Sequence, residues 1–328
     1  MTKKPHFCLV GDVGGTNARL GIADITGNTP KITTPKSYPR ANIASFYELV
    51  ERYLKETGAK LPHSIVVAVA GPIQNGEVTL TNGQWHIAEE ELRRRGFGMA
   101  RLINDYAALA YAVEHLTDDD LALIGSVRSS LPGETVGVLG AGTGLGVAAL
   151  ARDLGTSCVM VTEGGHIAFA PVDETEYGIL RLLAERYGRV SVERVLSGPG
   201  LANIHWALGR MKNLKTEELS PQEISSRGVA KSDPLCVEAL DVFCGIYGRT
   251  AGDLALAFGA RGGIYLGGGI APRLIDQLNA GTFRRCFEEK NRFNDYVKPI
   301  PTKVITHPYA ALLGSAEAAI RVLAQKGG

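Results

Sequence analysis

The sequence predicts an α/β protein with a duplicated core. Segments that have the length and apolar pattern of strands alternate with helical segments along the chain. The order strand, glycine-rich turn, strand occurs twice, with turns at residues 11–17 and 140–146. The chain holds 40 glycines among 328 residues, and many gather in such turns, where backbone can approach a ligand closely. Two related α/β halves are therefore expected rather than one doubly wound sheet.

Apolar runs and capping residues divide the first half into elements. Strands are expected where short apolar runs end at turn residues, at 7–10, 19–25, 65–70, 78–81 and 99–103. The first two are expected to pair as a hairpin with a wide loop. A helix over 46–57 is predicted because Ser45 and Glu48 have capping-box spacing and Gly58 follows the last turn. Charged residues and helical apolar spacing predict further helices at 89–95 and 106–116.

The second half follows a polar segment at 117–120, which is a candidate domain boundary. Strands are expected at 135–139, 147–151 and 263–266, and a further apolar segment lies at 158–161. Ser220 and Glu223 form a second capping box, with Pro221 at the first position of the helix that it predicts. Apolar periodicity predicts the remaining helices, at 176–187, 235–258 and 311–325.

Charge and cysteine usage exclude several classes of protein. Lysine and arginine number 35 against 34 acidic residues, so the net charge of +1 provides no basic field for nucleic acid. No apolar run approaches the ~18 residues of a membrane span, and the first residues lack the apolar region of a secretory signal. The five cysteines include no C-x-x-C pair, which indicates reduced thiols in a cytoplasm and no structural zinc cluster.

The first glycine turn is the strongest local signal. Its glycines leave backbone N–H groups available for phosphate oxygens, and Asp12 suits a hydrated Mg²⁺ that accompanies a nucleotide. A glycine-bulged hairpin in which Asp12 makes an Asx-turn explains the segment equally well. The sequence has no G-x-x-x-x-G-K-[ST], and its nearest G-x-G-x-x-G has Leu145 at the third glycine position. A Walker-type NTPase and a classical dinucleotide dehydrogenase are therefore disfavoured.

Polar residues that could carry chemistry follow three other segments. Asn104 and Asp105 stand where a strand ends and a helix begins, a favoured place for ligand groups, although capping alone explains them at least as well. Glu163 and His166 enclose two glycines that argue against a helix. A flexible loop that hydrogen-bonds a polyhydroxylated ligand fits this pair better than a zinc site. Glu193 lies in the first turn of a short helix and alone would be only a partner of the helix dipole.

Taken in order, these segments resemble the bacterial glucokinases that lack the cysteine-rich zinc motif, within the hexokinase branch of the actin-like ATPase superfamily. The resemblance covers nearly the whole chain and rests on 9–19 (LVGDVGGTNAR), 103–105 (IND), 140–146 (GAGTGLG), 163–166 (EGGH), 193–200 (ERVLSGPG) and 267–273 (GGGIAPR). The departures, at Ala271 and in the polar segment 211–233, affect neither the turns nor the acids.

The resemblance implies a duplicated actin-like (ribonuclease H-like) fold with two α/β domains around a cleft. The small domain is expected over 1–113 plus 308–328, and the large one, with helical additions, over 114–307. The implied reaction is phosphorylation of glucose by ATP to glucose 6-phosphate, the first step of glycolysis. Sugar hydroxyls are assigned to Asn104, Asp105, Glu163, His166 and Glu193, and Asp105 is also assigned the role of base. The nucleotide is assigned to Gly11, Asp12, Val13, Gly14, Gly15, Thr16, Asn17, Gly142, Thr143, Gly144 and Gly268.

The same resemblance implies ATP with Mg²⁺, held by Asp12 through water, no zinc, and a cytoplasmic homodimer that binds neither nucleic acid nor membrane. Two alternatives remain. A sugar-sensing repressor of related fold would need a helix-turn-helix before the strand expected from residue 7. An actin-like or chaperone ATPase would share the glycine turns but would not need the set Glu163, His166 and Glu193. An ATPase assay with and without sugar separates the last alternative from a sugar kinase.

Overall fold

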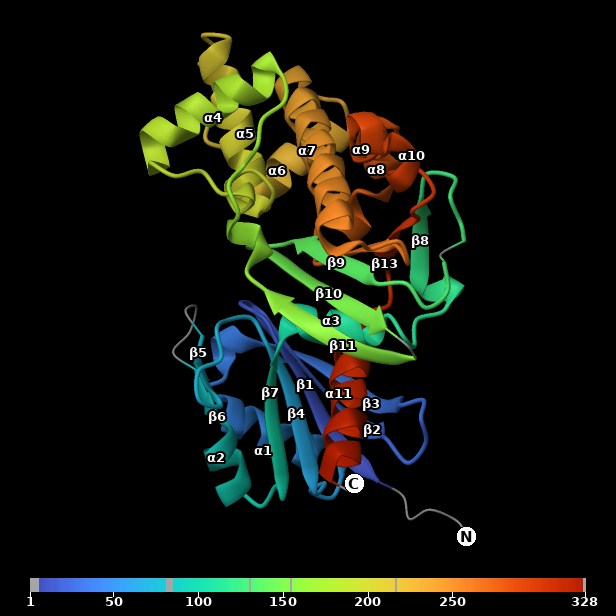
Figure 1. The fold of residues 1–328 in the computed structure, drawn as a ribbon. Coiled ribbons are helices and arrows are strands. Elements are labelled where there is room, and N and C mark those ends of the chain that lie inside the picture. Colours follow the sequence, from blue (N-terminus) through green and yellow to red (C-terminus); the bar gives the residue numbers. More distant parts are fainter. Residues whose placement is uncertain (1–5, 81–84, 130, 154, 216, 327–328) are drawn as a thin grey trace. The chain divides into compact units, whose positions relative to one another are not determined.

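The computed structural model describes residues 6–80, 85–129, 131–153, 155–215 and 217–326. The chain divides into two compact units: unit 1 is formed by residues 1–120 and 307–328, and unit 2 by residues 121–306. The first strand, β1 (Phe7–Val13), and the last helix, α11 (Ala310–Lys326), therefore belong to one unit (Figure 1). Within the described residues, no helix combines the length and the apolar character required to cross a membrane.

Unit 1 is built around a sheet whose described strands have the order β3-β2-β1-β4-β7. These strands are β1 (Phe7–Val13), β2 (Asn17–Asp24), β3 (Lys31–Pro39), β4 (Ser64–Val69) and β7 (Met99–Asn104). β1, β2 and β3 pair antiparallel, whereas β1, β4 and β7 are parallel. Leu9 belongs to one core cluster, and its neighbours Cys8 and Val10 belong to another. Both faces of the sheet are therefore buried, as expected for parallel strands.

Different helices cover the two faces of this sheet. α1 (Phe46–Thr57) places Phe46 and Leu49 in the cluster that contains Leu9. α11 (Ala310–Lys326) places Leu312 in the other cluster and packs against α3 (Asp105–Ala112). The remaining elements of unit 1 are α2 (Glu89–Arg94), the paired strands β5 (Glu77–Thr79) and β6 (His86–Ala88), and the 3₁₀ helices η1 (Arg40–Asn42) and η2 (Asp118–Asp120).

Helix α1 begins and ends where its capping residues predict. The Ser45 hydroxyl accepts the Glu48 N–H at 3.1 Å, and the Glu48 carboxylate accepts the Ala44 N–H at 3.0 Å. Gly58 follows the helix with a φ of 66°, a conformation that glycine adopts without strain.

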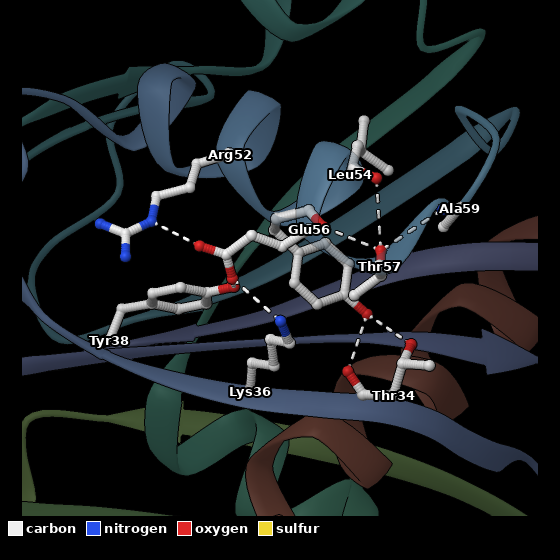
Figure 2. A network of polar contacts seen from close by, with 9 residues as sticks. Thr34, Lys36, Tyr38, Arg52, Leu54, Glu56, Thr57 and Ala59 are labelled. Atoms are coloured by element: carbon white, nitrogen blue, oxygen red, sulfur yellow. Dashed lines mark hydrogen bonds and ion pairs between the residues drawn. The ribbon is translucent and has the colours of Figure 1, made fainter.

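A polar network joins α1 to the edge strand β3 (Figure 2). The Glu56 carboxylate accepts hydrogen bonds from Lys36 Nζ at 2.9 Å, the Tyr38 hydroxyl at 2.9 Å and Arg52 Nε at 2.7 Å. These three donors lower the pKa of Glu56 to about 2. Lys36 and Tyr38 lie on β3, so the network fastens a largely exposed strand to the helix that packs beneath it.

Unit 2 repeats the strand order of unit 1 and adds an edge strand, giving β11-β10-β9-β12-β13-β8 among its described residues. These strands are β8 (Leu121–Ile124), β9 (Val136–Ala141), β10 (Leu145–Asp153), β11 (Thr156–Thr162), β12 (Ile264–Gly267) and β13 (Thr302–Ile305). β9, β10 and β11 pair antiparallel, and β9, β12 and β13 are parallel. The duplicated core that the sequence predicts is therefore confirmed.

Most of the helical mass of unit 2 packs around α7 (Pro234–Phe258), which contacts α5, α6 and α9. The other helices are α4 (Glu174–Tyr187), α5 (Gly198–Met211), α6 (Pro221–Val229), α8 (Ile275–Asn279), α9 (Thr282–Glu288) and α10 (Asn294–Val297). Short 3₁₀ helices are η3 (Gly164–His166), η4 (Val192–Arg194), η5 (Ala271–Arg273) and η6 (Asn291–Phe293). The capping box predicted at Ser220 and Glu223 is present at the start of α6.

Two local predictions are wrong. The wide loop expected after residue 10 is short, because β1 continues through Gly11 and Asp12 to Val13 and pairs there with β2 and β4. The segment between Glu163 and His166, expected as a flexible loop, forms the 3₁₀ helix η3. The two glycines are explained by packing, because a Cβ atom at either position would collide with β10.

Candidate active site

In unit 1, strand register places two predicted groups at one edge of the sheet. Val13 pairs with Val69, and Val69 pairs with Asn104, so β1, β4 and β7 end level with one another. Adjacent strands lie about 4.8 Å apart, which puts the turn after Val13 roughly 10 Å from Asn104. The first glycine turn and the start of α3 therefore share the carboxyl edge of the parallel strands, the usual place for ligands in α/β proteins.

Asp12 lies on β1 opposite Arg19 of β2. Arg19 Nη1 donates to Asp12 Oδ2 at 2.7 Å, and the Asp12 side chain is only 13% exposed. Burial raises the pKa of Asp12, and the Arg19 guanidinium opposes that rise. No cluster of three or more His, Cys, Asp or Glu with metal-site geometry occurs among the described residues. A single carboxylate could hold Mg²⁺ only if the ion kept most of its water or had further ligands from a bound molecule.

The first glycine turn consists of Gly14, Gly15 and Thr16, between β1 and β2. The Gly14 N–H donates to the Asn17 carbonyl at 3.0 Å, which closes the turn. The carbonyls of Gly14 and Gly15 accept hydrogen bonds from Arg40 Nη1, at 2.8 and 3.0 Å. The Thr16 carbonyl accepts the backbone N–H of Arg40 at 2.9 Å. No sequence motif points to Arg40, since it is more than twenty residues from the turn.

Asn104 and Asp105 begin helix α3. Asn104 Oδ1 accepts the N–H groups of Tyr106 and Ala107, at 2.9 and 3.1 Å, so the capping role is confirmed. Asp105 Oδ1 also accepts the Tyr106 N–H, at 3.0 Å. These contacts fix both side chains at the helix N-terminus, whose dipole favours the ionised carboxylate. They engage the oxygen of Asn104 and leave its Nδ2 donor outside the cap, so capping and ligand contact are compatible.

The second glycine turn, in unit 2, is held by a helix. The Gly142 N–H donates to the Gly144 carbonyl at 2.8 Å, and the Gly142 carbonyl accepts the Gly198 N–H at 2.8 Å. Gly198 is the first residue of α5, and the Ser197 hydroxyl caps that helix. The positive end of a 14-residue helix therefore adjoins the turn, an arrangement that favours anions. Gly268 follows β12 with a φ of 76°, at the same edge of the sheet.

Leu145, which begins β10, brings the remaining predicted residues of unit 2 together. Its N–H donates to Glu193 Oε2 at 2.8 Å. A Cβ atom on Gly144 would lie 2.6 Å from the same carboxylate oxygen, so glycine is required for this approach. Gly165, between Glu163 and His166, packs directly against the Leu145 backbone. The second turn, Glu193 and the η3 segment thus converge on one residue.

Glu163 and His166 lie side by side at the ends of η3. His166 Nε2 is 3.9 Å from Glu163 Oε2, and both side chains are more than half exposed. Arg189 Nη2 donates to the His166 carbonyl at 2.9 Å, and the Val192 N–H donates to the Ile167 carbonyl at 2.9 Å. The second of these bonds connects η3 to η4, which carries Glu193. Two carboxylates and an imidazole are therefore presented by adjoining backbone, a set that can bind sugar hydroxyls.

A cavity of about 610 Å³ also lies in unit 2, between α4, α5 and the segment before α6. Its wall includes Tyr187, Trp206 and Pro199. It contains none of the residues predicted from the motifs, although Pro199 directly follows Gly198, which binds the second turn.

Known proteins of one family match this chain in both sequence and structure. A family model described as Glucokinase matches residues 9–322. A glucokinase from Caulobacter sp. (strain K31) is 48% identical over 311 residues, covering 94% of each chain. A solved glucokinase from an Antarctic psychrotroph is 34% identical, with a TM-score of 0.86 over 95% of this chain and 98% of its own. A Balamuthia mandrillaris glucokinase, solved in complex with glucose, shares the fold at 22% identity, with a TM-score of 0.78 over 97% and 94%.

Proposed function

The chain belongs to the glucokinase family, and on this premise we propose that Asp105 is the general base in transfer of the ATP γ-phosphoryl group to the glucose 6-hydroxyl. The protein is an enzyme that phosphorylates glucose, and its fold is the duplicated actin-like one. The observation that carries the proposal is the shared sheet edge in unit 1, where Asp105 and the first glycine turn lie at the ends of parallel strands.

The sugar is bound by Asn104, Asp105, Glu163, His166 and Glu193. Three carboxylates, an amide and an imidazole match the donors and acceptors of a hexose ring. The capping bonds of Asn104 support this role, because they fix the side chain without using its Nδ2 donor. The bond from Leu145 fixes Glu193 in a similar way through one carboxylate oxygen.

The nucleotide phosphates are bound by the two glycine turns and the adjoining residues. The N–H groups of Gly14 and Gly142 close the two turns, and the residues that follow them, up to Asn17 and Gly144, supply backbone N–H groups to the phosphates. Gly11, Val13 and Gly268 shape the strands and the turn beside them. Mg²⁺ bound with ATP would neutralise phosphate charge, and Asp12 would hold it through water.

In the reaction, Asp105 accepts the proton of the 6-hydroxyl as its oxygen attacks the γ-phosphorus. The new oxygen–phosphorus bond replaces the bond to the β–γ bridging oxygen, and ADP leaves in line. The chain therefore has to orient the hydroxyl, accept one proton and neutralise charge, with no covalent intermediate. We further propose that the enzyme acts in the cytoplasm as a homodimer, with Mg²⁺ and without zinc.

The test is ADP release from ATP in the presence of Mg²⁺ with a panel of hexoses. Glucose should stimulate ADP formation, and the product should carry phosphate on its 6-hydroxyl. ADP formation that is unchanged by glucose but stimulated by another acceptor, such as acetate, would contradict the proposal. ADP formation that is equal with and without every sugar would indicate an actin-like ATPase instead.

A further inference from the structure

We propose that Arg40 is a positioning residue for the nucleotide, because it orients the N–H groups of the first glycine turn toward the phosphates. Arg40 begins η1, directly after β3 and within unit 1. The inference rests on the proposed function in one respect, namely that a nucleotide binds at this turn.

The geometry of the peptide bond carries the first step. The carbonyls of Gly14, Gly15 and Thr16 are all held by N–H groups of Arg40, two by its guanidinium and one by its backbone. In a planar trans peptide, the carbonyl of one residue and the N–H of the next point in opposite directions. The N–H groups of Gly15, Thr16 and Asn17 are therefore turned away from Arg40. Consecutive N–H groups that point to one side form an anion-binding concavity.

The exposure of the turn agrees with this orientation. Gly15 and Thr16 are exposed, whereas Arg40 is 6% exposed. Within the described part of the chain, the N–H groups of Gly15 and Thr16 have no hydrogen-bond acceptor. Arg40 thus occupies the buried side of the turn, and the unused donors face the side that a ligand can reach.

The guanidinium itself indicates that the ligand is an anion. Arg40 forms no ion pair with a carboxylate in the described residues, and its Nε and Nη2 atoms have no acceptor there. Arginine remains charged in proteins, so this is a buried cation whose charge is uncompensated. A phosphate group bound to the first glycine turn, on the side opposite Arg40, would supply the missing negative charge.

Trp85 supports Arg40 from beneath. The guanidinium carbon lies 4.6 Å from the centroid of the Trp85 ring, which favours a cation. Trp85 Nε1 donates to the Ile43 carbonyl at 3.0 Å, just after η1, and this bond fixes the ring. Arginine suits the position because its planar group can stack on the ring while its edge donates to two carbonyls, which the ammonium of lysine cannot reproduce.

The experiment compares Arg40→Met and Arg40→Lys with a matched control, Arg95→Met. Arg95 also lies over an aromatic ring, 4.5 Å from the centroid of Tyr47, but it pairs with glutamates at the surface and makes no bond to the turn. For each protein, ADP and pyrophosphate affinities are measured by calorimetry, kcat and KM are measured for both substrates, and thermal unfolding is followed with and without ADP.

For Arg40→Met we expect the KM for ATP and the Kd for ADP and for pyrophosphate to rise about tenfold or more, the usual effect of losing charge-assisted hydrogen bonds. The KM for glucose should change less than about twofold. Without ligand, Arg40→Met should unfold at the wild-type temperature or higher, since an uncompensated charge is removed. Arg40→Lys, which keeps the charge but not the fork of donors, should be intermediate, and Arg95→Met should behave as the wild type.

Equal ADP and pyrophosphate affinity in wild type and Arg40→Met would overturn the inference. So would a parallel rise in the KM values for ATP and glucose, because that would indicate general damage. If Arg40→Met does not fold, the same two criteria apply to Arg40→Lys. A wild type without glucose-dependent ADP formation, but with ADP binding that depends on Arg40, would contradict the proposed function and leave this inference intact.

Discussion

The two glycine turns occupy the same place in two copies of one topology, yet the chain fixes them by different means. Each turn joins two neighbouring antiparallel strands at equivalent positions in the two sheets, β1 to β2 or β9 to β10. Three carbonyls of the first turn are bound by Arg40, a buried cation. In the second turn, the Gly142 carbonyl is bound by the N-terminus of α5, and the residue after the turn donates to the carboxylate of Glu193.

This difference separates the roles of two related turns. A turn above an uncompensated guanidinium can accept only a ligand with strong negative charge. A turn beside a carboxylate would repel phosphate on that side, while the carboxylate can accept hydrogen bonds from sugar hydroxyls. Duplication thus supplies two equivalent backbone turns, both proposed here to bind phosphates. A different charged side chain lies near each: Arg40 holds the first turn, and Glu193, beside the second, adds a carboxylate that can bind the sugar.

The largest expected effect compares the carboxylates near the two turns. Asp105→Asn keeps the size and the cap contact but removes the proton acceptor, so kcat should fall by at least ~10²-fold. Glucose affinity should weaken much less. Glu193→Gln keeps an acceptor for the Leu145 N–H, and should raise the KM for glucose with less than a tenfold fall in kcat. If Asp105→Asn turned over at nearly the wild-type rate, Asp105 would not be the base and would have only a structural role at the start of α3. Single-turnover phosphoryl transfer and glucose titration measure the two quantities separately.

A second prediction introduces the same methyl group into each turn. A Cβ on Gly144 would lie 2.6 Å from Glu193 Oε2, whereas a Cβ on Gly14 would have its nearest neighbour, the Asn17 carbonyl, at 3.6 Å. Gly144→Ala should therefore displace Glu193 and raise the KM for glucose by about tenfold, the effect of losing one charge-assisted hydrogen bond. Gly14→Ala, which leaves Glu193 in place, should change the KM for glucose by less than about twofold. Steady-state kinetics of both variants checks this, and equal effects would show that the turns are not fixed differently.

A third prediction concerns His166, which belongs to the sugar side of the comparison. His166→Gln retains one donor and one acceptor, so the KM for glucose should rise a few-fold. Thermal stability should change little because the side chain is more than half exposed. The purified protein should contain no stoichiometric zinc, and activity lost to a chelator should return fully with added Mg²⁺. A tightly bound zinc ion that is lost together with the fold in this variant would identify a structural metal site instead.

Local patterns predicted the parts of the fold that are specified locally. The capping boxes at Ser45 and Ser220 located the starts of α1 and α6, and the glycine turns located both hairpins. The third strand of unit 1 was missed because β3 is an edge strand whose side chains are mostly exposed, so it lacks an apolar alternation. The short strands β8 and β13 were not predicted either. Helix α5 was missed as well, although Ser197 caps it.

The site was predictable only as far as its residues form contiguous motifs. Asn104, Asp105, Glu163 and His166 stand in short motifs, and the resemblance assigned them together with Glu193. Within unit 2, the approach of the η3 segment to Glu193 depends on long-range contacts that no local pattern encodes, such as the bond between Leu145 and Glu193. Arg40 is the extreme case. The role proposed for it rests on three backbone carbonyls and a tryptophan ring that lie far from it in sequence.

The smallest expected effect concerns two edge strands, β3 in unit 1 and β11 in unit 2. β3 is fastened by Glu56, whereas β11 leaves Met160 and Val161 exposed. The folded pKa of Glu56, about 2, is below its ordinary value of 4.5, so its contribution to stability is present above 4.5 and is lost as the pH falls toward 2. Glu56→Gln should lower the unfolding temperature slightly near neutral pH, and the difference from wild type should shrink between about pH 5 and pH 3. The control is Glu90→Gln, because Glu90 forms exposed ion pairs with arginines of α2. A difference that stays constant over this range would show that the network acts through packing rather than through charge.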